Sequence, residues 1–357
     1  MIDSLFIDNF KKFTAFKLEN LKRINIISGS NNTGKSTILE ALFLFYDRSA
    51  PDFLFKQHFF RGSQVANTEA ASLWQPFFYN FDLSKKIVIR VKDSGTTHEA
   101  KYIHENDVSS IITEMSKTNV NPTNTSTTSV SGQVAALRGQ FKHGQASAGE
   151  TLLYPSSAND LSMSQNQLKA PSKRVVFVSS APKAHAVEDA SRFGELLVRG
   201  ETDHLVDLVK KMEPKIKKLT LATLAGAPTI YCDVGLAQLV PLQMMGEGLG
   251  KYLSILISVS SLNNSVVCID ELENGIHYSL FEDVFKSIEE IAQRKNNQIF
   301  ITTHNHDLLK GLAKHINASG SESFEFIRID NKNGEMIPKY YDSELISAAM
   351  DSSWEIR

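Results

Sequence analysis

The chain is short of the features that mark secreted, membrane-spanning and disulfide-stabilised proteins. Its 357 residues include only two cysteines, Cys232 and Cys268, and both lie in apolar, strand-like runs. This usage is typical of buried thiols in a reducing compartment. No apolar run reaches the ~18 residues of a membrane span, and the start of the chain lacks the charged and apolar regions of a signal peptide. We therefore expect a cytoplasmic protein with no membrane partner.

The sequence also lacks a strong charge of either sign. Its formal net charge is -2 and its pI is about 6.6, which argues against the overall basicity of many nucleic-acid-binding proteins. It has no Cys/His cluster with metal-ligand spacing, no nucleophile elbow, no internal repeat and no heptad series long enough for a coiled-coil arm. One local basic run, 210–218, has two interpretations. It is either a contact for nucleic-acid phosphates or a solvated helix end.

One loop carries the strongest functional signal. It follows the apolar run 24–28, precedes the amphipathic run 38–45 and has the spacing G-x-x-x-x-G-K-[ST]. Its residues are Gly29, Ser30, Asn31, Asn32, Thr33, Gly34, Lys35, Ser36 and Thr37. Glycines let backbone N–H groups wrap a phosphate chain, and a helix N-terminus adds positive potential. The pattern predicts a nucleotide-binding loop in which Lys35 reaches the outer phosphates and Ser36 holds Mg²⁺.

Two later strands are expected to bring further reactive side chains to the same place. The apolar run 265–269 ends in Asp270 and Glu271, and the run 298–302 leads to His304. Sheets in α/β proteins place their ligands at the carboxyl ends of the strands. We therefore expect Asp270 to hold Mg²⁺, Glu271 to act as general base on the attacking water, and His304 to sense the γ-phosphate.

A second glycine-rich segment, Gly246-Glu247-Gly248, stands before a predicted helix at 248–259. Glycines ahead of a helix N-terminus form an anion site. The alternative is a simple turn that starts a helix. The segment lies just ahead of the Asp270 strand, too late in the chain to be the primary phosphate loop.

Buried strands that alternate with helices predict an α/β fold. The strand pair 2–7 and 13–18 adds an N-terminal antiparallel β part, and 86–91 and 99–104 are expected to pair. Between them and the next buried strand, 174–180, the composition turns to Ser, Thr, Asn, Gln and Gly. We predict three segments, with a polar, mobile or partly ordered insertion in the middle. Their ranges are 1–105, 106–170 and 171–357.

The order of these motifs resembles the ABC-type ATPase head of the SMC and RecF-like superfamily. More narrowly, the chain resembles the ATPases related to the overcoming-lysogenization-defect (OLD) nucleases and to bacterial phage-defence ATPases. The resemblance covers most of the chain except about 106–170, and the string Asp-Glu-x-Glu-Asn-Gly-x-His is rather specific to this subgroup. Its matching segments are 9–13, 29–37, 246–248, 270–277 and 303–304.

The resemblance implies roles for individual residues. Lys35 binds the β- and γ-phosphates of ATP, Ser36 and Asp270 serve Mg²⁺, and Glu271 is the hydrolytic base. His304 is the switch histidine. Two protomers sandwich two ATP molecules, so that Gly246, Glu247 and Gly248 contact the ATP bound by the partner. Lys11 or Lys12 is expected to reach the nucleotide from the N-terminal strand pair.

The sequence departs from the family pattern at three points. Gly246 stands where many ABC proteins have a signature serine, which removes one γ-phosphate donor. The chain ends at Arg357, which leaves no room for the TOPRIM nuclease domain of OLD proteins. The glutamine of the family's Q-loop is not evident, and Gln57 is the one candidate. It lies in an aromatic run, 53–60, which either packs in the core or stacks nucleic-acid bases.

Together these features predict an ATP-binding and ATP-hydrolysing enzyme that dimerises around ATP. Such a dimer or higher oligomer would act as a switch or sensor for a separate effector, a nuclease or a toxin, in anti-phage defence. A RecF-like DNA-binding ATPase of repair or recombination is the alternative, and nucleic acid is its partner. A scaffold that binds ATP without turnover is a third interpretation.

Overall fold

The computed structural model describes residues 1–48, 74–109, 135–155, 161–180, 186–224 and 226–341. The aromatic run 53–60 with Gln57 lies outside these ranges. Apart from Met1, the chain forms two compact units. The first comprises Asn20–Tyr46 with Lys173–Arg357, and the second comprises Ile2–Glu19 with Asp47–Ser172.

The first unit is built on a six-stranded sheet in the order β16-β15-β3-β14-β13-β9. The strands are β3 (Ile24–Gly29), β9 (Val175–Val178), β13 (Val266–Ile269), β14 (Gln298–Thr302), β15 (Phe324–Lys332) and β16 (Glu335–Tyr341). All neighbours are parallel except β16, which is antiparallel to β15. Strand β14 lies between β3 and β13, so the carboxyl ends of these three strands are adjacent.

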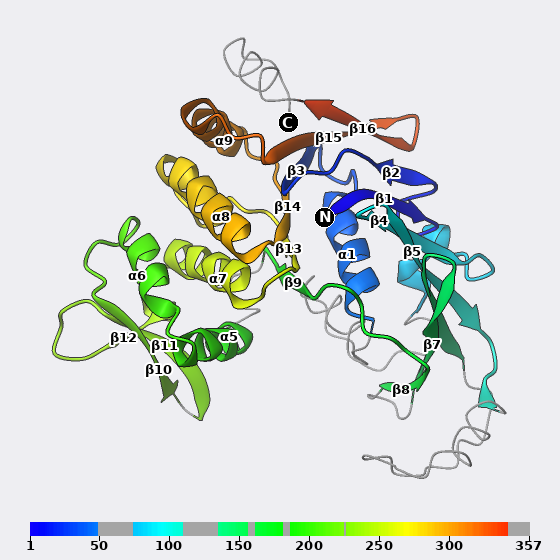
Figure 1. Cartoon of the computed structure of the whole chain (residues 1–357), viewed down its shortest axis with the longest axis horizontal. Helices are drawn as coiled ribbons and strands as arrows, with labels where there is room; N and C mark the ends of the chain where they lie inside the picture. The colour runs from blue at the N-terminus through cyan, green and yellow to red at the C-terminus, as the bar shows by residue number, and fades with distance from the viewer. Residues whose placement is uncertain (49–73, 110–134, 156–160, 181–185, 225, 342–357) are drawn as a thin grey trace. The chain divides into compact units, whose positions relative to one another are not determined.

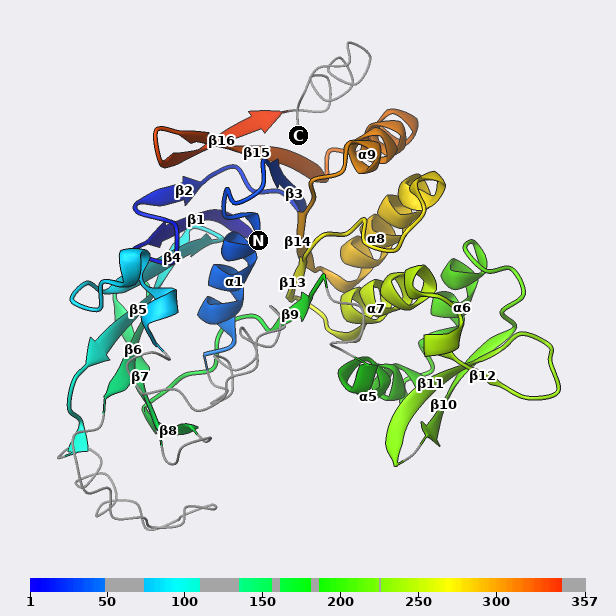
Figure 2. The same ribbon diagram turned by 180° about the vertical axis from the view of Figure 1, so that it is seen from behind.

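Helices cover both faces of this sheet (Figures 1 and 2). One face carries α1 (Lys35–Tyr46), and the other carries α7 (Glu247–Ser261), α8 (Phe281–Lys295) and α9 (His306–Ser319). Helices α5 (Ala186–Val198) and α6 (Thr202–Lys210) pack against α7. The short 3₁₀ turn η3 (Leu242–Met244) precedes α7, and a second one, η4 (Tyr278–Leu280), precedes α8.

Burial of apolar side chains explains this layering. Ile24, Ile26, Ile299 and Ile301 are fully buried and belong to one core cluster with residues of α7, α8 and α9. Burying each such side chain contributes roughly 1.5–3 kcal/mol relative to exposure. The stretch 37–46 of α1 is buried on every side, so the amphipathic pattern expected there is wrong. A helix that is apolar around its circumference is a buried helix.

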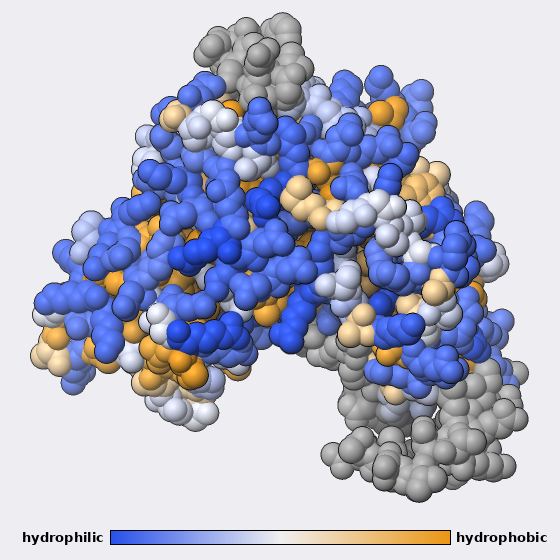
Figure 3. Space-filling view, viewed as in Figure 1, coloured by the Kyte–Doolittle hydropathy of each residue, from blue (hydrophilic) through white to orange (hydrophobic). Residues whose placement is uncertain are grey.

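A three-stranded sheet lies beside α5 in the same unit. It consists of β10 (Lys218–Leu224), β11 (Ala227–Asp233) and β12 (Val240–Pro241). The face in Figure 3 is largely hydrophilic but has apolar surface over α5, a helix in which Val187, Leu197 and Val198 are exposed. In the described part of the chain, no helix is both long and apolar enough to cross a membrane.

The second unit is a seven-stranded antiparallel sheet in the order β2-β1-β4-β5-β6-β7-β8. Its strands are β1 (Ile2–Asp8), β2 (Phe16–Leu18), β4 (Ile87–Asp93), β5 (Thr96–Glu105), β6 (Ala136–His143), β7 (Ala146–Pro155) and β8 (Leu161–Asn166). Two 3₁₀ turns, η1 (Gln75–Phe77) and η2 (Tyr79–Phe81), precede β4. The expected N-terminal antiparallel pair and the pairing of β4 with β5 are confirmed.

The expected segment boundaries differ from the structure in two ways. Residues 20–46 join 173–357 rather than 2–19, because β3 is an inner strand of the six-stranded sheet. The insertion 106–170 is not without regular structure, since β6, β7 and β8 fall within it. Strand β6 buries Leu137 and Phe141 and strand β7 buries Leu153, and one buried face is enough to hold an antiparallel sheet.

Candidate active site

The phosphate loop joins β3 to α1 as expected. Strand β3 ends at Gly29 and α1 begins at Lys35. Gly29, Asn32 and Gly34 have φ of 139°, 69° and 91°, and such conformations let successive N–H groups turn toward one centre. A Cβ on Gly29 would lie 2.4 Å from the carbonyl oxygen of Ile329. This position therefore admits only glycine, because both its backbone angle and its neighbour exclude a side chain.

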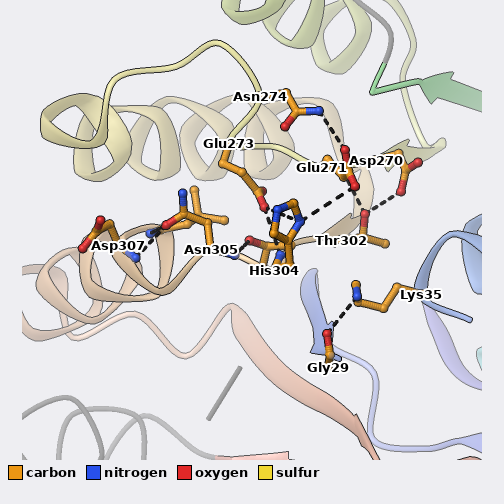
Figure 4. A network of polar contacts seen from close by, with 12 residues as sticks. Gly29, Lys35, Asp270, Glu271, Glu273, Asn274, Thr302, His304, Asn305 and Asp307 are labelled. Atoms are coloured by element: carbon orange, nitrogen blue, oxygen red, sulfur yellow. Dashed lines mark hydrogen bonds and ion pairs between the residues drawn. The ribbon is translucent and has the colours of Figure 1, made fainter. Parts of the chain in front are cut away.

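Lys35 lies at the base of this loop. Its Nζ donates hydrogen bonds to the carbonyl oxygens of Gly29 at 2.8 Å and Ser30 at 3.0 Å. Burial lowers the pKa of Lys35, while the carboxylates of Glu271 and Asp270 act in the opposite direction. Figure 4 shows Lys35 on the side of the site facing those carboxylates. The positive charge of Lys35, which the sequence predicts to bind the outer phosphates, therefore lies at the phosphate loop.

Asp270 and Ser36 meet although they are far apart in the chain. Ser36 Oγ donates to Asp270 Oδ1 at 2.8 Å, and Thr302 Oγ1 donates to the same oxygen at 2.6 Å. Burial raises the pKa of the Asp270 carboxyl, and these two hydrogen bonds oppose that rise. Ser36 of α1, Asp270 after β13 and Thr302 of β14 thereby bring three oxygen atoms to one point.

Glu271 follows in an unusual backbone conformation. Its φ is 48°, and its N–H donates to Thr302 Oγ1 at 2.9 Å. Asn274 Nδ2 donates to Glu271 Oε2 at 2.8 Å. The side chain is 38% exposed, so one part of the carboxylate is held while another part reaches solvent. A base that acts on water needs this combination of orientation and access.

His304 lies between two carboxylates (Figure 4). Its Nδ1 is 3.2 Å from Glu273 Oε1 and 3.8 Å from Glu271 Oε1. Its backbone N–H also donates to Glu273 Oε1 at 2.9 Å. Glu273 is 5% exposed and His304 is 48% exposed. Glu273 therefore holds His304 through the backbone N–H and Nδ1, and the rest of the imidazole ring stays accessible to solvent.

The second glycine-rich segment forms the start of α7. Gly246 has φ of 101° and is the N-cap of this helix, and both Gly246 and Glu247 are exposed. A Cβ on Gly248 would lie 2.0 Å from the carbonyl oxygen of Gly275. The segment thus packs directly on the loop that follows Glu271 in the same chain.

Lys11 and Lys12 belong to the other compact unit, outside the unit that holds the phosphate loop. Lys11 has φ of 51°, and its Nζ lies 5.4 Å from the ring centre of Phe10 and 5.2 Å from that of Phe77. The expected contact of Lys11 or Lys12 with the nucleotide stays a prediction.

Four residues of the site received no role from the sequence. They are Lys251, Glu273, Asn274 and Thr302. Lys251 of α7 is 4% exposed, and its Nζ donates to the carbonyl oxygens of Ser179 at 2.6 Å and Asp270 at 3.2 Å. Burial lowers the pKa of Lys251 to about 8, against the pull of Asp270 and Glu271. Only the string 270–277 signalled any of the four, through Glu273 and Asn274.

The donor atoms suit a magnesium nucleotide. Mg²⁺ prefers oxygen ligands, and it is commonly held by one or two protein groups together with substrate phosphates. Ser36 Oγ and Asp270 Oδ1 supply such oxygens beside the phosphate loop. Within the described ranges, no three His, Cys, Asp or Glu side chains are grouped as metal ligands. The residues therefore fit a cation shared with phosphates rather than one enclosed by protein alone.

Comparisons with known proteins agree with this chemistry. A family model described as "AAA domain, putative AbiEii toxin, Type IV TA system" matches residues 24–310. A protein of Helicobacter pylori named "ATP/GTP phosphatase" is 26% identical over 335 residues, which cover 87% of each chain. An uncharacterized protein of Methanocaldococcus jannaschii is 29% identical over 113 residues, 32% of this chain and 90% of its own.

Among solved structures, an SMC head bound to the C-winged helix domain of ScpA aligns with a TM-score of 0.49 and 11% identity, over 96% of this chain and 98% of that one. The SMC head domain of Thermotoga maritima aligns with a TM-score of 0.39 and 12% identity. The family match extends over the phosphate loop, Asp270, Glu271 and His304 and over well more than half of the chain. The chain therefore belongs to this family of AAA domains and is an ATPase.

Proposed function

We propose that the chain hydrolyses ATP in a site shared by two copies and acts as a nucleotide-controlled switch for a separate effector. The observation that carries the proposal is the convergence of β3, β13 and β14. Their carboxyl ends bring Lys35, Asp270, Glu271 and His304 together at one edge of the sheet. The ends of parallel strands are where α/β folds bind ligands.

Each side chain has a separable task in hydrolysis. Lys35 neutralises phosphate charge, and Ser36 with Asp270 holds Mg²⁺, which supplies further charge neutralisation when bound. Glu271 takes a proton from water as the water oxygen bonds to the γ-phosphorus. The bond from that phosphorus to the bridging oxygen of ADP breaks in the same displacement. His304, whose Nδ1 lies 3.8 Å from Glu271 Oε1, contacts the γ-phosphate.

The exposed start of α7 supports the shared site. Gly246 and Glu247 present a helix N-terminus to solvent, and helix N-termini favour anions. In this proposal they close over the ATP bound by a second copy. Because Gly246 replaces the signature serine of many ABC proteins, the contact acts through backbone N–H groups and the helix dipole.

The proposed setting is anti-phage defence, with a nuclease or toxin as the effector. Support comes from the resemblance of 270–277 to OLD-related ATPases and from the family description, which names a toxin and a type IV toxin–antitoxin system. A separate effector would supply the activity that the ATPase controls.

Phosphate release by the wild type and by Glu271→Gln tests the proposal. We expect hydrolysis to fall by about 10²-fold or more, while ATP binding persists. The ATP-bound variant should then sediment and scatter light as a dimer, whereas the nucleotide-free protein should not. Equal hydrolysis rates would remove Glu271 as the base, and a monomer at saturating ATP would remove the shared site.

One feature favours the DNA-binding alternative. Lysines 210, 211, 215, 217 and 218 are all exposed around the end of α6 and the start of β10. Phosphate contacts by such a group make DNA binding weaken steeply with salt. Salt-dependent binding of DNA that is lost when these lysines become glutamine would favour the alternative over the effector switch.

A further inference from the structure

Thr302 contacts three consecutive residues of the candidate catalytic loop. Its Oγ1 donates to Asp270 Oδ1 at 2.6 Å and accepts the N–H of Glu271 at 2.9 Å. Its carbonyl oxygen accepts the N–H of Leu272 at 3.2 Å. Thr302 is fully buried at the end of β14. One residue of the middle strand therefore holds both the carboxylate expected at the cation and the backbone of the expected base.

Strand register explains why Thr302 occupies this position. Strands β13 and β14 are parallel, and their last paired residues are Ile269 and Ile301. The next residues along the two strands are Asp270 and Thr302. Because β14 also pairs with β3, Thr302 stands between the phosphate loop and the Asp270 strand. No other threonine of the site shares this arrangement, since Thr303 Oγ1 accepts the N–H of Asn305 instead.

The backbone of Glu271 needs such a support. Its φ of 48° lies in the left-handed region, which residues other than glycine adopt rarely and which persists only when the surroundings impose it. The hydroxyl of Thr302 receives the N–H of this residue. Without that acceptor, the N–H would lose its hydrogen-bond partner in a buried place, and Glu271 would gain freedom to turn away.

We infer that Thr302 is a positioning residue that couples Asp270 to Glu271 through a single hydroxyl. The hydroxyl fixes the rotamer of Asp270 and the backbone of Glu271 together, so that the cation site and the base form one rigid unit. This inference rests on the proposed function. The reaction needs Thr302, although Thr302 does not contact the reacting atoms.

Two variants at this position separate the hydroxyl from the bulk of the side chain. Thr302→Val keeps the shape and removes both side-chain hydrogen bonds, while Thr302→Ser keeps the hydroxyl and removes a methyl group. Thr229→Val is the matched control, because Thr229 is also buried but lies in β11 of the three-stranded sheet. Each variant is measured for kcat, for KM, for binding of a fluorescent ATP analogue and for melting temperature without nucleotide.

We expect Thr302→Val to lower kcat by about tenfold or more, because misplacement of a base affects the chemical step most strongly. Binding of the ATP analogue should change by less than about threefold, since Lys35 and the phosphate loop are untouched. Thr302→Ser and Thr229→Val should keep kcat within about threefold of wild type. Wild-type kcat in Thr302→Val, or equal losses in Thr302→Ser and Thr302→Val, would overturn the inference.

Two further measurements cover the remaining cases. If Thr302→Val lowers the melting temperature markedly, Thr302→Cys replaces it, because a thiol has similar volume but hydrogen-bonds weakly. Wild-type kcat in Thr302→Cys overturns the inference, and a loss that Thr302→Ser does not share supports it. If Glu271→Gln itself retains hydrolysis, the proposed function fails. If Glu271→Gln is inactive while Thr302→Val turns over normally, only the role of Thr302 fails.

Discussion

The amide of Asn274 holds the carboxylate of Glu271 by a hydrogen bond of 2.8 Å from Nδ2 to Oε2. The two residues lie three positions apart on the loop between β13 and η4. Glu271 is thus fixed at both ends, by Thr302 at its backbone and by Asn274 at its side chain. Orientation of a base within a site is worth a large share of a rate enhancement.

Loss of the Asn274 amide should therefore slow hydrolysis without weakening ATP binding. We expect Asn274→Ala to lower kcat by about tenfold. Asn274→Asp should lower it further, because a second negative charge beside Glu271 favours the protonated base. Steady-state kinetics with a binding assay for the nucleotide check this. A rise in KM with unchanged kcat would show that Asn274 serves binding instead.

Glu273 should matter through His304. Its Oε1 accepts a hydrogen bond from the backbone N–H of His304 and lies 3.2 Å from Nδ1 of the same residue. We expect Glu273→Gln and His304→Gln each to lower kcat by about 10²-fold. The double variant should lose little more than either alone, because groups that act as a unit are not additive. If the loss of kcat in the double variant equals the product of the two single losses, the two residues act independently.

Gly248 should be intolerant of any side chain, and Gly250 offers the matched control. A Cβ on Gly248 would lie 2.0 Å from Gly275 O, whereas a Cβ on Gly250 meets nothing within 4 Å outside its own helix. We expect Gly248→Ala to lower the free energy of unfolding by about 1–3 kcal/mol. Gly250→Ala should raise it by about 0.5–1 kcal/mol, because alanine favours helix. Urea unfolding measures both, and equal effects would contradict the packing argument.

Glu289 should contribute stability that is lost in acid. Its Oε2 lies 2.7 Å from His315 Nε2 between α8 and α9. Burial raises the pKa of Glu289, but hydrogen bonds from Ser321 and His315 outweigh burial and leave this pKa below its usual range. A folded-state pKa below the unfolded one contributes stability above the unfolded pKa, and that stability is lost as pH falls through the folded pKa.

Glu289→Gln should accordingly be less stable than wild type at pH 7 by about 1–3 kcal/mol. The difference should shrink as pH falls below about 4, near the pKa of an unfolded glutamate. Urea unfolding from pH 7 to pH 3 measures it, with the exposed Glu322→Gln as control. A difference that grows toward low pH would have the wrong sign.

The parts of the site that are contiguous in sequence were predictable, and the parts that depend on strand register were not. The spacing from Gly29 to Thr37 carries its own chemistry, and apolar runs place Asp270 and His304 at strand ends. The contact of Thr302 with Asp270 requires that Ile269 pair with Ile301, and no local pattern encodes that pairing. Lys251 is similar, since a lysine within an apolar helix gives no sign of the two carbonyl groups it meets.

The fold shows the same division. Buried strands with apolar runs, such as β3 and β14, were found from sequence because both of their faces are covered. Strands β6 and β7 were missed because polar residues interrupt their apolar ones and the surrounding segment is rich in Ser, Thr and Gly. Their buried residues, among them Leu137 and Phe141, mark a sheet with one covered face, which composition alone does not distinguish from an irregular loop.

The hydrogen bond from Ser36 to Asp270 spans 234 positions of the chain, and the strand between them in space, β14, is made later still. A ribosome adding roughly 5–20 residues per second needs tens of seconds to pass from the phosphate loop to these partners. Throughout that interval the nascent chain carries the phosphate loop but lacks Asp270, Glu271 and His304. In the proposed mechanism, a product that stops before β14 lacks Thr302 and His304, so incomplete copies would not hydrolyse ATP on their own.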